Sequence, residues 1–99
     1  MNISIIYFNF PFWRAEVSRI ALHIGKIQYN NIIVDREEFI RVRSSGQLDD
    51  GTVIPFHQLP CLLVDNESIG QTAGIARYCG KLSGLYPKDE YILAAKIDQ

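Results

Sequence analysis

The pattern of apolar and polar positions divides the chain into alternating strand-like and helix-like segments. Residues Asn2 to Phe8 are rich in β-branched and aromatic side chains and are apolar on both alternating faces, which is typical of a central strand covered on both sides. Asn9 to Trp13 contains a proline and predicts a loop. From Arg14 apolar residues recur at helical spacing up to Gly25, and this spacing predicts a helix with one apolar face: Val17, Ile20, Ala21 and Ile24.

The middle of the chain alternates in the same way. Tyr29 to Val34 predicts a second strand, and Asp35 to Ser44 is polar with a weak helical pattern. Ser45 to His57 contains two glycines and a proline and predicts an extended loop. Cys61 to Val64 is short, apolar and bounded by turn residues, so it predicts a buried strand, which a polar turn connects to a short return strand ending at Gly70.

A helix is expected from Thr72 to Ser83. The Thr72 hydroxyl can accept from the unpaired amides of the first turn, as an N-cap does, and Gly84 can end the helix in a left-handed conformation. One face of this segment is apolar, formed by Ile75, Ala76, Cys79 and Leu82. Tyr91 to Gln99 begins another helical pattern. The predicted fold is therefore an α/β domain with a four-stranded mixed sheet and helices on both faces.

Composition narrows the function classes. The 99 residues suit one small domain, and 47% hydrophobic content is enough for a core. A net charge of -1 without a block of Lys and Arg argues against nucleic-acid binding. The apolar segment Ile3 to Trp13 is too short to span a membrane and lacks the features of a signal peptide. Cys61 and Cys79 have no metal-site spacing, so we expect buried thiols of a reducing compartment such as the cytoplasm.

Two local features suggest a ligand. The start of the Thr72 helix carries partial positive charge and free amides, which attract a carboxylate. Pro60 cannot donate to a sheet, which leaves the backbone groups of Leu59 available to a bound extended chain. Together these features predict a site for a short anionic peptide, although a threonine at a helix start can also serve only as a cap.

The same residues carry a family resemblance. Gln58-Leu59-Pro60 followed by Val64-Asp65, and then the segment from Gln71 to Tyr78 (QTAGIARY), resembles the glutathione-binding half of a cytosolic glutathione S-transferase, most of all the sigma-like group. The resemblance implies a thioredoxin-like β-α-β-α-β-β-α fold over residues 1–86, with Pro60 in a cis bond. It also implies that residues 87–99 are a linker and the first turns of an all-helical second domain, so that the chain would be truncated.

Tyr7 is the expected catalytic residue. It lies at the predicted C-terminal end of the first strand, where open α/β sheets usually bind ligands. The family motif there resembles Tyr7-Phe8 followed by Arg14-Ala15-Glu16, and it implies that the Tyr7 hydroxyl donates a hydrogen bond to the glutathione sulfur. The spacing to Arg14 is one residue longer than is usual in sigma-like members, with the segment 10–13 in place of a glycine-containing loop. Without the resemblance, a core aromatic residue with its hydroxyl satisfied locally would be the better interpretation of Tyr7.

The resemblance also implies how the tripeptide is held. Gln71 and Thr72 match the pair that binds the γ-glutamyl carboxylate. Leu59, next to Pro60, matches the position whose backbone pairs with the cysteinyl part. Gln58 matches a polar side chain near the glycyl carboxylate.

Four further residues are assigned less specifically. Phe39 and Arg43, four residues apart, match an aromatic and a basic position at the glycyl end, but phenylalanine stands where tryptophan is common and cannot donate. Arg43 can equally be a solvated charge, and Arg14 can either interact with the ligand or cap a loop. Asp98 matches an acidic residue that reaches the ligand amino group in a partner subunit. His23 and His57 match no functional position.

The resemblance implies transfer of the glutathione thiolate to a hydrophobic electrophile by a homodimer, with glutathione as co-substrate and without a metal. Two alternatives stay open at this level. One is a non-catalytic, crystallin-like glutathione-binding module, and the other is a glutathione-dependent isomerase. A glutaredoxin-like redox role is disfavoured because no cysteine follows the first strand.

Overall fold

A computed structural model describes residues 1–9 and 13–99 of the chain. Its sheet has the strand order β2-β1-β3-β4. β1 and β2 are parallel, whereas β3 is antiparallel to both β1 and β4. The four-stranded mixed sheet expected from the sequence is therefore confirmed, and its strands are β1 (Ile3–Tyr7), β2 (Asn30–Ile33), β3 (Cys61–Val64) and β4 (Glu67–Ile69).

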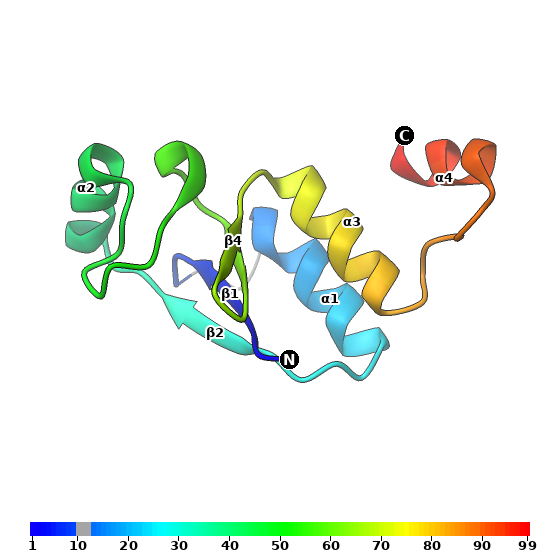
Figure 1. Cartoon of the computed structure of the whole chain (residues 1–99), viewed down its shortest axis with the longest axis horizontal. Helices are drawn as coiled ribbons and strands as arrows, with labels where there is room; N and C mark the ends of the chain where they lie inside the picture. The colour runs from blue at the N-terminus through cyan, green and yellow to red at the C-terminus, as the bar shows by residue number, and fades with distance from the viewer. Residues whose placement is uncertain (10–12) are drawn as a thin grey trace.

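The helices cover the sheet from both sides. Figure 1 shows α1 and α3 side by side on one side of the sheet and α2 on the other, with α4 set apart at the C-terminal end. This order is the thioredoxin-like β-α-β-α-β-β-α arrangement followed by one more helix. The helical segments are η1 (Trp13–Ala15), α1 (Glu16–Ile24), α2 (Arg36–Ser45), η2 (Pro55–His57), α3 (Thr72–Leu82) and α4 (Tyr91–Asp98), of which η1 and η2 are short 3₁₀ turns.

The core is centred on β1 and β3. All five residues of β1 are buried, as predicted for a central strand covered on both faces. Helices α1 and α3 contribute Leu22, Ile75 and Cys79 to the same apolar cluster. Leu62 of β3 lies opposite Ile5 of β1, and both side chains are completely buried. The apolar core therefore extends along β1 to the edge at which this strand ends.

Helix α1 buries a different face from the one that its apolar spacing predicted. Ala21 is buried as predicted, but Val17, Ile20 and Ile24 are 60%, 50% and 56% exposed, and Ser18 and Leu22 face inward in their place. Small residues are needed inside because α1 packs closely on α3. A Cβ added to Gly25 would lie 2.5 Å from the Cβ of Ser83.

The end of α1 lies where the sequence predicts it. Gly25 ends the helix as predicted, but with a right-handed φ of -77°, and the left-handed residue is Lys26 with φ 55°. Gly25 is therefore required for the close approach of α3 and not for backbone freedom.

The segment with the weak helical pattern, residues 35–44, does form a helix, α2. Asp35 is its N-cap and accepts a hydrogen bond from the Glu38 amide at 2.8 Å, and Gly46 ends it with φ 73°. The pattern is weak because Val42 is the one fully buried residue of α2. The following loop, expected to be extended, contains the bridge between Gln47 and Val53 and the turn η2. The loop predicted at residues 9–13 falls largely outside the described residues.

Both cysteines are unbridged and buried, as expected. Burial raises the pKa of the Cys61 thiol, and burial likewise raises the pKa of the Cys79 thiol, so neither favours the reactive thiolate form. In the part of the chain that the structure covers, the longest and most apolar helices still fall short of what is needed to cross a bilayer.

Candidate functional site

The strand register brings three predicted segments to one edge of the sheet. Ile6 pairs with Cys61, so Tyr7 and Pro60 each lie one residue further towards the same edge. Leu62 pairs with Ile69, the last residue of β4, so the chain enters α3 at this edge as well. Residues that are far apart in the sequence therefore converge at the end of β1, the edge at which α/β sheets usually bind ligands.

The segment before β3 offers its backbone at this edge. The Leu59–Pro60 peptide bond is cis, as the resemblance implied, and both side chains are buried. Among the described residues, the amide and the carbonyl of Leu59 have no backbone partner. One donor and one acceptor are thus available on a single residue, the arrangement that pairs with an extended peptide.

The start of α3 corrects one prediction. Thr72 is not the N-cap but the first residue of the helix, and the N-cap is Gln71, whose side chain makes no capping hydrogen bond. Gln71 has φ 73° and ψ 122°, a conformation that L-residues rarely adopt. Capping by Thr72 would need an extended backbone, whereas this unusual conformation turns the chain into the helix one residue earlier.

This helix start suits an anion. The first turn of α3 contains no acidic residue, and its leading amides have no partner within the helix. Thr72 is half-buried and Gln71 is exposed, so both remain accessible from the edge of the sheet. A carboxylate there would receive amide hydrogen bonds and the favourable end of the helix dipole.

Tyr7 is almost completely covered, with 5% of its surface exposed. Its carbonyl accepts a hydrogen bond of 2.9 Å from the Val34 amide, which fixes the strand end, and its ring lies 5.4 Å from that of Phe8. In residues 1–9 and 13–99, no group is hydrogen-bonded to the Tyr7 hydroxyl. Within these residues, the Tyr7 hydroxyl therefore donates its proton to no protein acceptor.

Arg19 is a residue of this region that sequence reasoning missed. Its guanidinium carbon lies 5.9 Å from the centre of the Tyr7 ring, and its Nε donates to Asn31 Oδ1 at 2.9 Å. Glu16 lies 3.8 Å away on the same helix. No pattern in the sequence indicates this contact, because it depends on how α1 crosses the sheet. A cation held beside Tyr7 favours negative charge at this edge.

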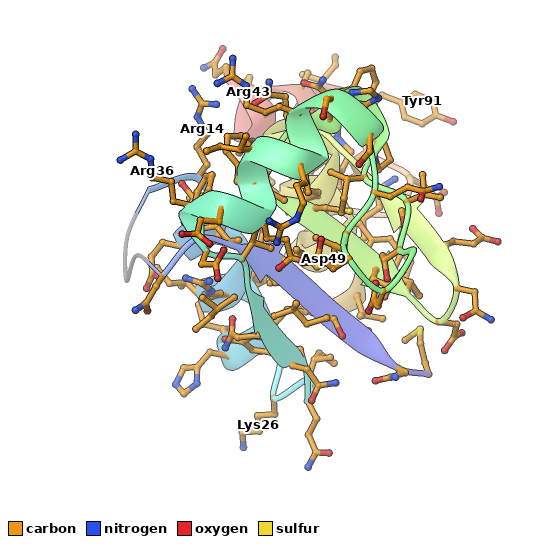
Figure 2. The ribbon with its side chains drawn as sticks, turned by 90° about the vertical axis from the view of Figure 1, so that its left-hand side faces the viewer. Arg14, Lys26, Arg36, Arg43, Asp49 and Tyr91 are labelled. Atoms are coloured by element: carbon orange, nitrogen blue, oxygen red, sulfur yellow. The ribbon has the colours of Figure 1, made fainter. Side chains whose placement is uncertain are left out.

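The opposite side of the edge is formed by α2. The Phe39 ring packs edge-on against the Phe8 ring at 4.8 Å and 79°, which anchors α2 to the end of β1. Arg43, Arg14 and Gln58 are exposed. Figure 2 shows Arg14, Arg36 and Arg43 extending outward on the same side of the molecule, so several cations gather there in a chain whose net charge is only -1.

Comparisons with known proteins are consistent with this geometry. No family model matches the chain. Glutathione S-transferase 2 of Caenorhabditis elegans is 31% identical over 87 residues, which are 85% of this chain and 42% of the relative. The crystal structure of the glutathione S-transferase from Ascaris lumbricoides superposes with a TM-score of 0.81 and 28% identity, covering 99% of this chain and 43% of that one. The chain belongs to the glutathione S-transferase family.

The match is to the N-terminal, thioredoxin-like domain of these transferases. S-crystallin 2 of Enteroctopus dofleini is also similar, with 30% identity over 94 residues, or 94% of this chain and 40% of the relative. The chain thus spans about two fifths of the length of the curated relatives that it matches.

Asp98 lies apart from the other candidate residues of this transferase domain, on α4 (Figure 1). Its Oδ2 atom accepts hydrogen bonds of 2.7 Å from Arg77 and 2.7 Å from the Tyr86 hydroxyl. The hydrogen bond from Tyr86, and after it that from Arg77, holds the pKa of the Asp98 carboxyl below its ordinary value. Within the domain, Asp98 therefore attaches α4 to α3.

We predict that α4 loosens in acid. Because the pKa of Asp98 is lowered in the folded state, its stabilising contribution is present above the ordinary carboxyl pKa and is lost as the pH falls below about 4. Backbone amide resonances of α4 should shift in this range in the wild type but not in Asp98→Asn. Asp89→Asn, an exposed change nearby, should keep the transition. Resonances of α4 that stay constant down to this pH in the wild type would contradict the attachment.

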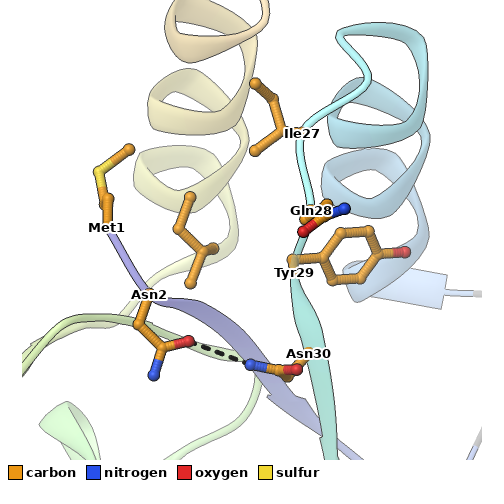
Figure 3. Close-up of a pocket in the computed structure, with 7 residues that line it drawn as sticks. Met1, Asn2, Ile27, Gln28, Tyr29 and Asn30 are labelled. Carbon is orange, nitrogen blue, oxygen red and sulfur yellow. Dashed lines mark hydrogen bonds between the residues drawn. The ribbon is translucent and has the colours of Figure 1, made fainter.

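A hollow of about 490 Å³ lies at the other end of the sheet, and it is not part of this site. It is lined by residues that begin β1 and β2, where the Asn30 amide donates to Asn2 Oδ1 at 3.1 Å (Figure 3). Because β1 and β2 are parallel, their starts lie a full strand length from Tyr7.

Proposed function

We propose that the edge formed by Tyr7, Leu59–Pro60 and the start of α3 binds glutathione, and that Tyr7 activates its thiol for transfer to a hydrophobic electrophile. The observation that carries this proposal is the backbone of Leu59, which has no backbone partner in residues 1–9 and 13–99 and lies next to the end of β1 and to a helix start without acidic residues. A peptide with a carboxylate at one end matches this combination.

The tripeptide would lie across the edge from α3 to α2. Its γ-glutamyl carboxylate binds the leading amides of α3 with the Thr72 hydroxyl and Gln71. Its cysteinyl part pairs with the Leu59 backbone. Its glycyl carboxylate lies near Gln58 and Arg43, and since Phe39 packs on Phe8 and has no donor, Arg43 supplies most of the charge there.

Activation requires a modest free energy. A thiol with a pKa of about 8.5 is mostly protonated at neutral pH. Lowering that pKa by about two units needs roughly 2.7 kcal/mol in favour of the thiolate. A hydrogen bond to a charged group supplies about 1.5–3 kcal/mol, so the Tyr7 hydroxyl nearly suffices. The nearby Arg19 guanidinium favours the same anion.

The whole protein is proposed to be a cytoplasmic homodimer in which α4 begins an all-helical second domain. Two unbridged, buried cysteines suit a reducing compartment. Both observed contacts of Asp98 use Oδ2, so its Oδ1 atom is the one proposed to reach the amino group of the ligand in the partner subunit.

The glutathione site is tested by Thr72→Val, which removes the hydroxyl and keeps the shape of the side chain. We expect glutathione to bind about tenfold more weakly or worse, because one hydrogen bond to its carboxylate is lost. Calorimetric titration measures the effect. Thr72→Ser keeps the hydroxyl and should bind as the wild type does, and equal affinity of Thr72→Val and the wild type would contradict this placement of the carboxylate.

A second candidate function is a glutathione-binding module without transferase activity. The similarity to an S-crystallin over 94% of the chain supports this alternative. The two functions differ in the pKa that they predict for the thiol of bound glutathione. A module that binds glutathione without lowering the pKa of its thiol would be non-catalytic, and thiolate absorbance distinguishes the two.

A further inference from the structure

The turn η2 connects the two helices that hold opposite ends of the proposed ligand. Just before it, the Ile54 amide donates to the Gly46 carbonyl at the end of α2, at 2.7 Å. On the other side, a Cβ added to Gly70 would lie 2.9 Å from the Phe56 ring, immediately before the start of α3. The position of η2 therefore determines how the end of α2 lies relative to the start of α3.

His57 makes the contact between η2 and α2. Its Nδ1 lies 3.1 Å from the carbonyl oxygen of Arg43, and since a carbonyl can only accept, Nδ1 carries the proton. This carbonyl belongs to the last turn of α2, where the helix itself provides no donor. The ring also rests on Gly46, where an added Cβ would lie 2.5 Å from Nε2. The side chain of His57 thus closes the end of α2.

The backbone of η2 adopts an unfavourable conformation to make this contact. Phe56 and His57 have φ values of 62° and 54°, in the left-handed region that residues with a Cβ rarely adopt. Gln58 follows directly, and Leu59 comes next. His57 therefore contacts the backbone of Arg43 and directly precedes Gln58, the two residues proposed to bind the glycyl carboxylate.

We propose that His57 is a positioning residue for the glycyl end of glutathione, acting through the carbonyl of Arg43. Its N–H holds the last turn of α2 against the segment that continues into Gln58 and Leu59, and so fixes the position of the Arg43 guanidinium. This inference rests on the proposed function, because it concerns one end of the same ligand. It does not involve the γ-glutamyl end, which lies at α3.

The test compares glutathione with γ-glutamylcysteine, which lacks the glycyl residue, by calorimetric titration of the full chain. His57→Gly removes the donor and tolerates the left-handed backbone. We expect H57G to bind glutathione about two- to tenfold more weakly, the loss of one neutral hydrogen bond, with γ-glutamylcysteine unchanged. His57→Asn also tolerates this backbone and places an amide donor near the Nδ1 position, so it should restore the affinity for glutathione.

A double substitution shows whether His57 acts through Arg43. Arg43→Met removes the guanidinium, and adding H57G to it should cost no further affinity for glutathione if the two residues act as one unit. His57→Ala serves the same comparison should H57G fail to fold.

The two proposals fail in different ways. Binding of neither peptide by the wild type would reject the glutathione site itself. If the wild type binds both peptides and H57G weakens both equally, or neither, His57 is only a helix cap and the positioning role is wrong.

Discussion

Tyr7→Phe should lower the rate of glutathione conjugation by about ten- to a hundredfold in a chain that carries the helical second domain. The substitution removes one hydrogen bond to the sulfur anion, which is worth about 1.5–3 kcal/mol, and leaves the buried ring in place. Affinity for glutathione should hardly change, because the hydroxyl acts on the ionised sulfur and not on the carboxylates that hold the peptide. Steady-state kinetics with a model electrophile and calorimetric titration measure the two quantities separately.

Tyr29→Phe is the matched control for this prediction. It makes the same chemical change at the other end of the sheet, where Tyr29 lines the hollow beside Asn30. Its conjugation rate should equal that of the wild type. Unchanged conjugation in Tyr7→Phe would show that another group stabilises the thiolate.

Ile5→Ala should have the largest effect on folding. Ile5 is fully buried in the central strand, where its neighbours in the sheet are Asn31 of β2 and Leu62 of β3, so truncation leaves a gap in a closely packed core. Loss of such a side chain costs about 2–5 kcal/mol, a large part of the stability of a small domain. Urea denaturation followed by circular dichroism measures the free energy of unfolding.

Ile33→Ala is the corresponding control on the neighbouring strand. Ile33 is 55% exposed, so the same truncation there should cost less than about 1 kcal/mol. Comparable losses at both positions would mean that β1 is not the centre of the core.

Much of the fold could be predicted from the sequence because local patterns and tertiary burial agree in the strands. Cys61 to Val64 was expected as a buried strand, and β3 has the same bounds. The apolar run of β1 is buried on both faces, as the lack of alternation indicated. The segments that carry the family motif, from Gln58 to Pro60 and from Gln71 onward, do meet beside the end of β1.

The errors arise where a contact between distant residues overrides a local pattern. Helix α1 leaves Val17, Ile20 and Ile24 exposed because its small residues are needed against α3, and helical spacing alone cannot say which face another helix will cover. Thr72 has a residue type suited to a cap, but the cap position falls on Gln71, whose left-handed backbone no residue preference indicated.

Two candidate site residues, Arg19 and His57, could not be predicted from the sequence for a similar reason. No local pattern places Arg19 beside Tyr7, because their proximity depends on how α1 crosses the sheet. His57 matches no functional position in the sequence, and its contact with the Arg43 carbonyl follows from the path of the whole loop between α2 and β3. Local sequence carries little information about such a path.

The central claim is that bound glutathione becomes an anion at the Tyr7 hydroxyl, and a pH titration of its thiolate absorbance on the protein tests this directly. We predict that the pKa of the bound thiol lies about one to two units below that of the free thiol and returns most of the way to the free value in Tyr7→Phe. Glutathione that binds with the thiol pKa of the free peptide would contradict the account.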